Sequence, residues 1–105
     1  MNITIEQAQE VIKILKKNQK LVTFTSHDFI GAYSKKFESD YINMLAEYKK
    51  KQTSKDTSKN IGKLHRQIGS FLKRNEKELG IISDGKVADM NVHHLETPSE
   101  KWNIV

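Results

Sequence analysis

The chain has 105 residues, of which 36% are hydrophobic and 30% charged, with a formal net charge of +5 and no cysteine. This length fits a single domain spanning residues 1–105, and without cysteine the chain has no disulfide, thiolate nucleophile or cysteine-ligated zinc. No apolar run is long enough to cross a bilayer, and residues 1–6 lack the charged and apolar regions of a signal peptide. We therefore expect a cytoplasmic protein that does not associate with membranes.

The first predicted element is a helix that begins with a capping box. Thr4 precedes Gln7 by three residues, and apolar residues then recur on one helical face as far as Leu15. The run from Leu21 to Thr25 is short and rich in β-branched and aromatic residues, which favours a strand or an extended connector.

Two short helices are predicted next. Thr25 or Ser26 can cap the first, and Ser39 caps the second after a short break. The apolar stripes consist of Phe29, Ile30, Tyr33 and Phe37 in the first helix and of Tyr41, Ile42, Leu45 and Tyr48 in the second. The pair therefore forms a corner of the helix-turn-helix type.

Positive charge is concentrated in the middle of the chain. Residues 49–77 hold ten basic residues and two acids, residues 1–48 hold six of each, and residues 78–105 hold two lysines and five acids. A concentrated positive field attracts polyanions such as nucleic acids. Because residues 49–60 include no apolar side chain, we expect them to form a mobile basic loop. The alternative is that these lysines only solvate a linker.

A long helix over residues 61–79 is the clearest predicted element, and Gly80 suits its C-cap. Its apolar face consists of Ile61, Leu64, Ile68, Phe71, Leu72 and Leu79. Its other side carries the candidate nucleic-acid-binding residues, namely Lys63, Arg66, Gln67, Ser70, Lys73, Arg74 and Lys77, with Lys49, Lys50 and Lys51 of the loop assisting.

The basic side of this helix has the chemistry of a nucleic-acid contact. Arg66 and Gln67 are residue types that read base edges. Gly69 and Ser70 leave the surface without bulk, so a phosphate backbone can approach closely. The alternative is a solvated surface helix in which Gly62 and Gly69 permit close helix packing.

A C-terminal hairpin is predicted after the long helix. Two short β-type runs flank Asp84 and Gly85, a dipeptide that suits a two-residue type I′ turn. Pro98 is expected to interrupt any longer strand. Trp102 indicates that the C-terminal tail folds back over an apolar surface.

The predicted order is a helix, a short strand, two helices, a long basic helix and a hairpin. Over about residues 20–95 this order resembles that of winged helix-turn-helix domains. The resemblance implies an α+β, mainly helical fold in which the basic helix enters the major groove and the hairpin touches neighbouring phosphates. It therefore implies non-catalytic binding of nucleic acid, with duplex DNA as the expected ligand.

No catalytic or metal-binding constellation is apparent in the sequence. The four histidines, His27, His65, His93 and His94, are dispersed, and the adjacent pair would point to opposite faces of a strand. The chain also has no glycine-rich phosphate loop and no nucleophile elbow. We therefore expect no enzymatic activity, no cofactor and no metal.

The alternative function is that of a protein-interaction module, such as a small adaptor or an inhibitor, whose basic segment docks on an acidic partner. The candidate anchors would be exposed aromatic residues, namely Tyr33, Tyr41, Tyr48 and Trp102. The competing interpretation is that these rings belong to the core. The acidic C-terminal segment also allows a homodimer in which it contacts the basic segment of a second copy.

Overall fold

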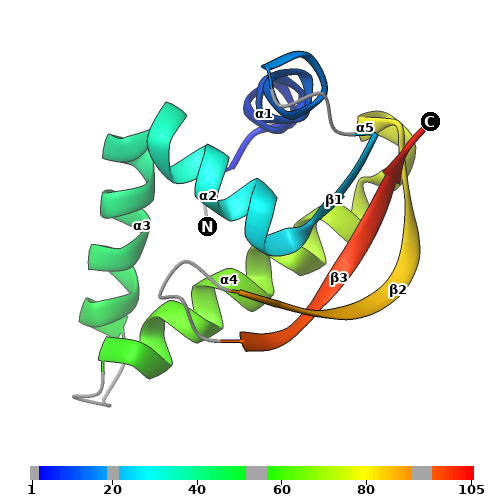
Figure 1. The fold of residues 1–105 in the computed structure, drawn as a ribbon. Helices are drawn as coiled ribbons and strands as arrows, with labels where there is room; N and C mark the ends of the chain where they lie inside the picture. Colours follow the sequence, from blue (N-terminus) through cyan, green and yellow to red (C-terminus); the bar gives the residue numbers. More distant parts are fainter. Residues whose placement is uncertain (1–2, 19–21, 52–56, 91–95) are drawn as a thin grey trace.

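The computed structural model describes residues 3–18, 22–51, 57–90 and 96–105, and it describes the side chains of these residues except for positions 18, 48–61 and 87–98. The elements are α1 (Ile5–Asn18), β1 (Thr23–Thr25), α2 (Ser26–Lys36), α3 (Glu38–Lys51), α4 (Thr57–Arg74), α5 (Glu76–Leu79), β2 (Ile81–Met90) and β3 (Glu96–Ile104). Helix α2 lies between α1 and α4, and a three-stranded sheet covers one side of the helices (Figure 1). The predicted α+β, mainly helical class is confirmed.

Capping boxes begin the first two helices. At α1, the Gln7 amide donates to Thr4 Oγ1 over 3.1 Å, and the Thr4 amide donates to Gln7 Oε1 over 3.3 Å. At α2, the Asp28 amide donates to Thr25 Oγ1 over 3.1 Å, and the Thr25 amide donates to Asp28 Oδ2 over 3.0 Å. Each box satisfies backbone donors that a helix leaves unpaired at its start. Thr25, rather than Ser26, is therefore the cap of α2.

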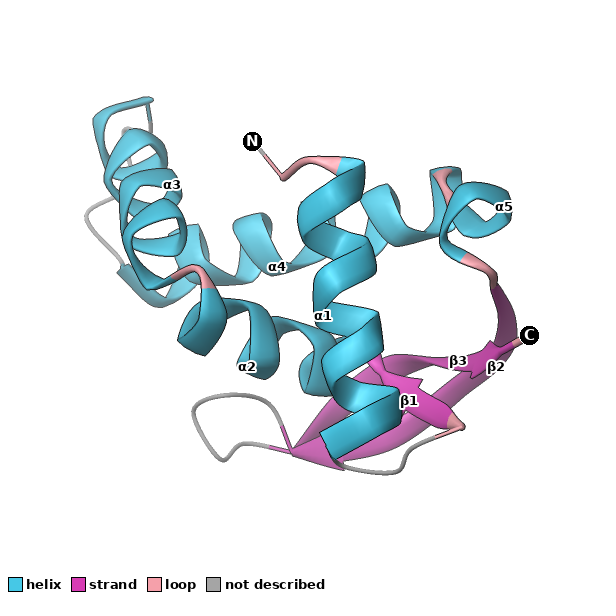
Figure 2. Ribbon diagram, turned by 90° about the horizontal axis from the view of Figure 1, so that it is seen from above, coloured by secondary structure: helices cyan, strands magenta, loops and turns pink. Residues whose placement is uncertain are grey.

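The core lies where α1, α2 and α4 meet the inner face of the sheet (Figure 2). Its largest fully buried side chains are Trp102, Tyr33, Phe24, Phe29, Leu15, Ile30, Leu64, Ile68, Leu72, Ile81 and Val11. The apolar stripes predicted for α1, α2 and α4 are confirmed where their side chains are described. On α3 the predicted stripe is wrong in one position, because Ile42 is 52% exposed and the neighbouring Met44 is buried in its place.

The sheet is antiparallel with the strand order β1-β3-β2. A β2–β3 hairpin is present, but the predicted turn at Asp84 and Gly85 is wrong. Ser83 pairs with Trp102 and Lys86 pairs with Glu100, so β2 carries one extra residue and forms a bulge. Gly85 accommodates this bulge with a φ of 84°. The segment that joins the two strands, residues 91–95, lies outside the described residues.

Pro98 lies within β3, where it pairs with Ala88, so the prediction that it interrupts the strand is wrong. The reason is its position in the sheet. Strand β1 pairs with β3 only between Lys101 and Asn103, so β3 has a partner on one side alone at Pro98. A proline can be accommodated there because it need not donate to a second strand.

The long basic helix is shorter than predicted at its C-terminal end. Helix α4 ends at Arg74, and the short α5 follows after Asn75. The Asn75 Nδ2 group donates to the carbonyl of Phe71 over 2.8 Å, where it competes with the helical backbone pattern. Gly80 then forms the expected C-cap, with a φ of 66°.

The loop expected over residues 49–60 is helical at both ends. Helix α3 continues to Lys51, and α4 begins at Thr57. The reason is that lysine, threonine and serine are tolerated on the solvated turns of a helix, so the lack of apolar residues did not mark the helix ends. The centre of the predicted loop, residues 52–56, lies outside the described residues.

Candidate functional site

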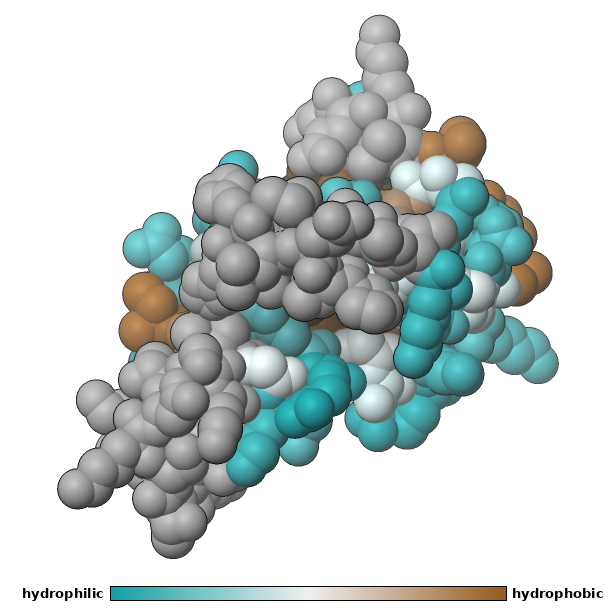
Figure 3. Space-filling model, turned by 60° about the horizontal axis from the view of Figure 1, so that its bottom comes forward, coloured by the Kyte–Doolittle hydropathy of each residue, from teal (hydrophilic) through white to brown (hydrophobic). Residues whose placement is uncertain are grey.

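A groove of about 600 Å³ lies between the start of α2, the length of α4 and the β2–β3 hairpin. Its described walls consist of Ser26, His27, Ile30, Gly62, His65, Arg66, Gly69, Ser70, Lys73, Lys86, Ser99, Glu100 and Trp102. Figure 3 brings the bottom of the Figure 1 view forward, and the described residues visible around the grey part of this face are mostly hydrophilic. The groove therefore brings together three elements that are distant in the sequence.

Helix α4 positions most of the predicted nucleic-acid-binding residues. Its apolar side, with Leu64, Ile68 and Leu72, is fully buried and fixes the rotation of the helix. The opposite side is exposed and carries Arg66, Gln67, Ser70, Lys73 and Arg74, while Lys63 is half-buried and Lys77 is exposed on α5.

The predicted residues of the basic region divide into those that line the groove and those that lie outside it. Arg66, Ser70 and Lys73 line the groove, and Lys86 of β2 joins them there. The other predicted residues of this region, Lys63, Gln67, Arg74 and Lys77, lie outside the groove lining. The backbone of Lys49, Lys50 and Lys51 belongs to α3, and their side chains lie outside the described ones.

Three exposed cations of α4 have no acidic partner within the described residues. Arg66, Lys73 and Arg74 form no ion pair and no hydrogen bond there. Residues 57–74 also include no acid that could offset them. By contrast, the Lys101 Nζ atom on β3 lies 3.7 Å from an Asp84 carboxylate oxygen. The exposed side of α4 is therefore a local positive field.

One carboxylate lies in the groove. Glu100 pairs across the strands with Lys86, and its Oε1 atom accepts a hydrogen bond from the Ser83 hydroxyl. Among the described lining residues, the three cations Arg66, Lys73 and Lys86 outnumber this acid, so the described lining carries a net positive charge.

Two serine hydroxyls lie in the groove wall opposite α4. Ser26 Oγ accepts a hydrogen bond from the Trp102 indole Nε1 over 3.0 Å and keeps its own hydrogen for donation. Ser99 is 4% exposed, and its hydroxyl has no hydrogen-bond partner among the described residues. A buried hydroxyl without a partner is costly, and such groups in proteins call for an explanation.

The glycines of α4 do not serve close packing. A Cβ atom on Gly69 would lie 3.8 Å from Ser26 Oγ, which is ordinary van der Waals contact, and one on Gly62 would meet nothing within 4 Å. Glycine in a helix interior costs about 1 kcal/mol relative to alanine. Among the described residues, neither glycine is required for close packing, and both leave the helix backbone without a side chain along the groove.

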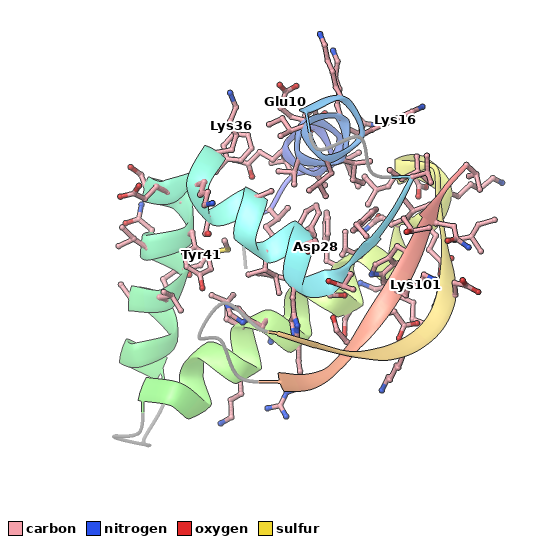
Figure 4. The ribbon with its side chains drawn as sticks, viewed as in Figure 1. Glu10, Lys16, Asp28, Lys36, Tyr41 and Lys101 are labelled. Atoms are coloured by element: carbon pink, nitrogen blue, oxygen red, sulfur yellow. The ribbon has the colours of Figure 1, made fainter. Side chains whose placement is uncertain are left out.

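His65 ties α4 to α3 beside the groove. Its Nε2 atom lies 2.7 Å from the Tyr41 hydroxyl, and the two rings stack at a centroid distance of 6.0 Å. Figure 4 shows Tyr41 projecting from α3 toward α4. Burial raises the pKa of the Tyr41 hydroxyl, which keeps it protonated. The sequence spacing of these two residues contained no signal for this contact.

The remaining histidines do not assemble a metal site in the described part of the chain. His27 and His65 both line the groove, but no group of three or more metal-binding side chains is found among the described residues. His93 and His94 lie outside those residues.

Two of the four candidate aromatic anchors belong to the core. Tyr33 and Trp102 are fully buried, and Tyr41 is half-buried against α4. The side chain of Tyr48 lies outside the described ones. The interpretation of Trp102 as a residue that seals the tail is confirmed.

No protein-family model, no curated protein and no solved structure matches this chain. None of the described helices is both long and apolar enough to span a membrane.

Proposed function

We propose that this chain binds nucleic acid without catalysis, with duplex DNA as its ligand, through the exposed side of α4. The observation that carries the proposal is the row formed by Arg66, Lys73 and Arg74 on α4, for which the described residues supply no acidic partner. A protein that places such cations against phosphates releases condensed counterions, and this release drives binding.

The shape of α4 also supports this ligand. Its 18 residues form a rod about 27 Å long, and an α-helix with its side chains is narrow enough to enter the major groove of B-DNA. Arg66 and Gln67 lie exposed near its middle, where a helix lying in the groove comes closest to base edges.

The arrangement around α4 offers further support. The order of helices and strands and the strand order β1-β3-β2 accord with the expected resemblance to winged helix-turn-helix domains. In such an arrangement the β2–β3 hairpin lies beside the recognition helix, as it does here across the groove. The cytoplasmic location expected from the sequence suits this role.

The test is fluorescence anisotropy of labelled duplex DNA, single-stranded DNA and RNA across a salt series. Wild-type protein should bind duplex DNA with an affinity that falls steeply with salt. Alanine at Arg66, Lys73 and Arg74 together should flatten the salt slope by about 0.9 for each lost phosphate contact.

A matched control removes the same charge elsewhere. Lys13, Lys16 and Lys17 are exposed on α1, on the far side of α2 from α4 (Figure 4). Their triple alanine variant should retain the wild-type slope. Equal losses in the two triple variants, or no binding at low salt, would refute the assignment to α4 and favour an acidic protein partner.

A further inference from the structure

We infer that the groove between α2, α4 and the hairpin is a phosphodiester site that holds one backbone phosphate of the bound nucleic acid. The inference rests on the proposed function for the class of its ligand. It adds to that function a specific site between α2, α4 and the hairpin, in which some of the groups that bind the phosphate lie outside α4.

Ser99 provides the first argument. Its side chain is almost fully buried in β3, it lines the groove, and its hydroxyl has no partner in the described chain. A phosphate that enters beside β3 and uncovers this hydroxyl would give its hydrogen an acceptor. The Ser26 hydroxyl lines the same groove and can donate as well, since it acts as an acceptor toward Trp102.

The start of α2 provides the second argument. Ser26 and His27 are the first two residues of α2, and both line the groove. Backbone amides in the first turn of a helix have no intrahelical acceptor, and the helix dipole there favours an anion. The amide of Asp28 is already taken by the Thr25 cap, so the ligand contact from this first turn is assigned to Ser26.

Charge and space agree with an anion of this kind. Arg66 and Lys73 reach the groove from α4, and Lys86 reaches it from β2. Glu100 opposes them, but it accepts a hydrogen bond from Ser83 and faces Lys86 across the strands. A site with excess positive charge and fixed hydroxyl donors suits the single negative charge of a phosphodiester.

The bare backbone of α4 allows close approach. Gly62 and Gly69 line the groove, and neither is needed for packing. A sugar–phosphate strand can therefore lie against the helix at these positions, with Arg66 between them.

The first experiment compares residues of the same type inside and outside the groove. Arg66 and Lys73 line it, whereas Arg74 and Lys77 are also exposed but do not line it. In duplex anisotropy, Arg66→Ala should weaken binding about tenfold, and Arg74→Ala by less than about threefold. Likewise, Lys73→Ala should weaken duplex binding more than Lys77→Ala does. Equal effects within both pairs would overturn the site.

Ser99 is then tested directly, because a general basic surface would not depend on it. Ser99→Ala should weaken duplex binding by about tenfold, the contribution of one hydrogen bond to a charged group. The variant removes a hydroxyl that has no partner in the described chain, so its unfolding midpoint should be unchanged or higher. Ser39→Ala on the exposed start of α3 is the control and should bind as the wild type does. Unchanged affinity in Ser99→Ala would overturn the inference.

A small probe separates the failure of this inference from that of the proposed function. Titration of the ¹⁵N-labelled protein with the dinucleotide dTpdT should shift the amide signals of Ser26 and Ser99, and inorganic phosphate should shift them less. Shifts without any duplex binding would refute the proposed function and keep the phosphodiester site. Duplex binding without shifts at either position would refute the site and keep the proposed function.

Discussion

Helices α1 and α4 face the same core but differ in how their charges are arranged. Both have a fully buried apolar side, with Val11 and Leu15 on α1 and Leu64 and Ile68 on α4. On α1, an acid lies in the first turn and lysines lie in the last turn, as the helix dipole favours. On α4 the first turn holds no acid. Lys73 and Arg74 lie in its last turn, as the lysines of α1 do, but Arg66 lies exposed in its middle.

The difference separates charge that stabilises a helix from charge that is available to a ligand. Lys16 and Lys17 lie at the negative end of the α1 dipole, and the two acids of this helix offset part of the charge of its lysines. Arg66, in the middle of α4, has no comparable role in the described structure. A basic surface therefore indicates binding only where the fold leaves its charge without a structural purpose.

The largest expected effect tests the feature that the two helices share. Leu15 and Leu64 are both fully buried, so Leu15→Ala and Leu64→Ala should each lower the free energy of unfolding by about 2–5 kcal/mol. Urea denaturation followed by circular dichroism measures this quantity. The control is Ile42→Ala, which should cost less than about 0.5 kcal/mol because Ile42 is 52% exposed. A small cost for Leu64→Ala alone would contradict the placement of α4 in the core.

The next effect concerns two tyrosines, one that joins α2 to α1 and one that joins α3 to α4. The Tyr33 hydroxyl of α2 donates to Gln7 Oε1 of α1 over 3.2 Å, and Gln7 Nε2 donates to Asp40 Oδ2 over 3.0 Å. Tyr41 makes the corresponding contact with His65 of α4. Burial, with a smaller contribution from the Asp40 charge, raises the pKa of Tyr33 from 10.0 to about 12.

Alkaline pH should therefore weaken the fold. Between pH 10 and 12 the unfolded chain loses the Tyr33 proton and the folded chain keeps it, so stability falls as pH rises through this window. The loss should reach about 2–3 kcal/mol for Tyr33, and the raised pKa of Tyr41 adds to it in the same direction. Denaturation at a series of pH values measures the slope. Tyr33→Phe should reduce the slope but not abolish it, and an unchanged slope would contradict the assignment.

Replacing glycines inside two helices should have a smaller effect, and it should raise rather than lower the free energy of unfolding. Gly62→Ala in α4 and Gly31→Ala in α2 should each raise the free energy of unfolding by up to about 1 kcal/mol, because neither added methyl group meets an atom within 4 Å. Only Gly62→Ala should also weaken DNA binding, since only Gly62 lines the groove. Gly80→Ala is the control for backbone strain and should destabilise the fold, because Gly80 has a φ of 66°. Equal DNA affinity of the two helix variants would contradict close approach at Gly62.

Local patterns predicted most of the helices. The capping box at Thr4 and the apolar periodicity around Leu64 depend on residues within a few turns of each other, so the sequence displays them directly. The break at Asn75 was missed because it depends on a side chain that competes with the backbone, which periodicity does not report. Likewise, Asp84 and Gly85 fit both a turn and a bulge, and only the pairing of β2 with β3 decides between them.

The candidate site was predictable only in part, for the same reason. The basic residues of α4 lie on one helical face, so their spacing shows them together. Ser26, Ser99 and Lys86 reach the groove through contacts between distant segments, such as the hydrogen bond between Trp102 and Ser26. No spacing in the sequence reports that kind of contact. The position of Ser99 in the groove wall can be predicted only after the register of β2 with β3 is known.

The smallest expected effect tests the comparison of α1 with α4 most directly. Lys16 lies in the last turn of α1, so Lys16→Ala should lower the free energy of unfolding by about 0.5 kcal/mol through loss of its interaction with the helix dipole. Arg66 lies in the middle of α4, away from either helix end, so Arg66→Ala should leave stability nearly unchanged while DNA affinity falls. Thermal denaturation at low and high salt separates the two, because salt screens the dipole term of Lys16. If Arg66→Ala proved the more destabilising of the two, the charge on α4 would be serving the fold, and the argument that it is available to a ligand would lose its basis.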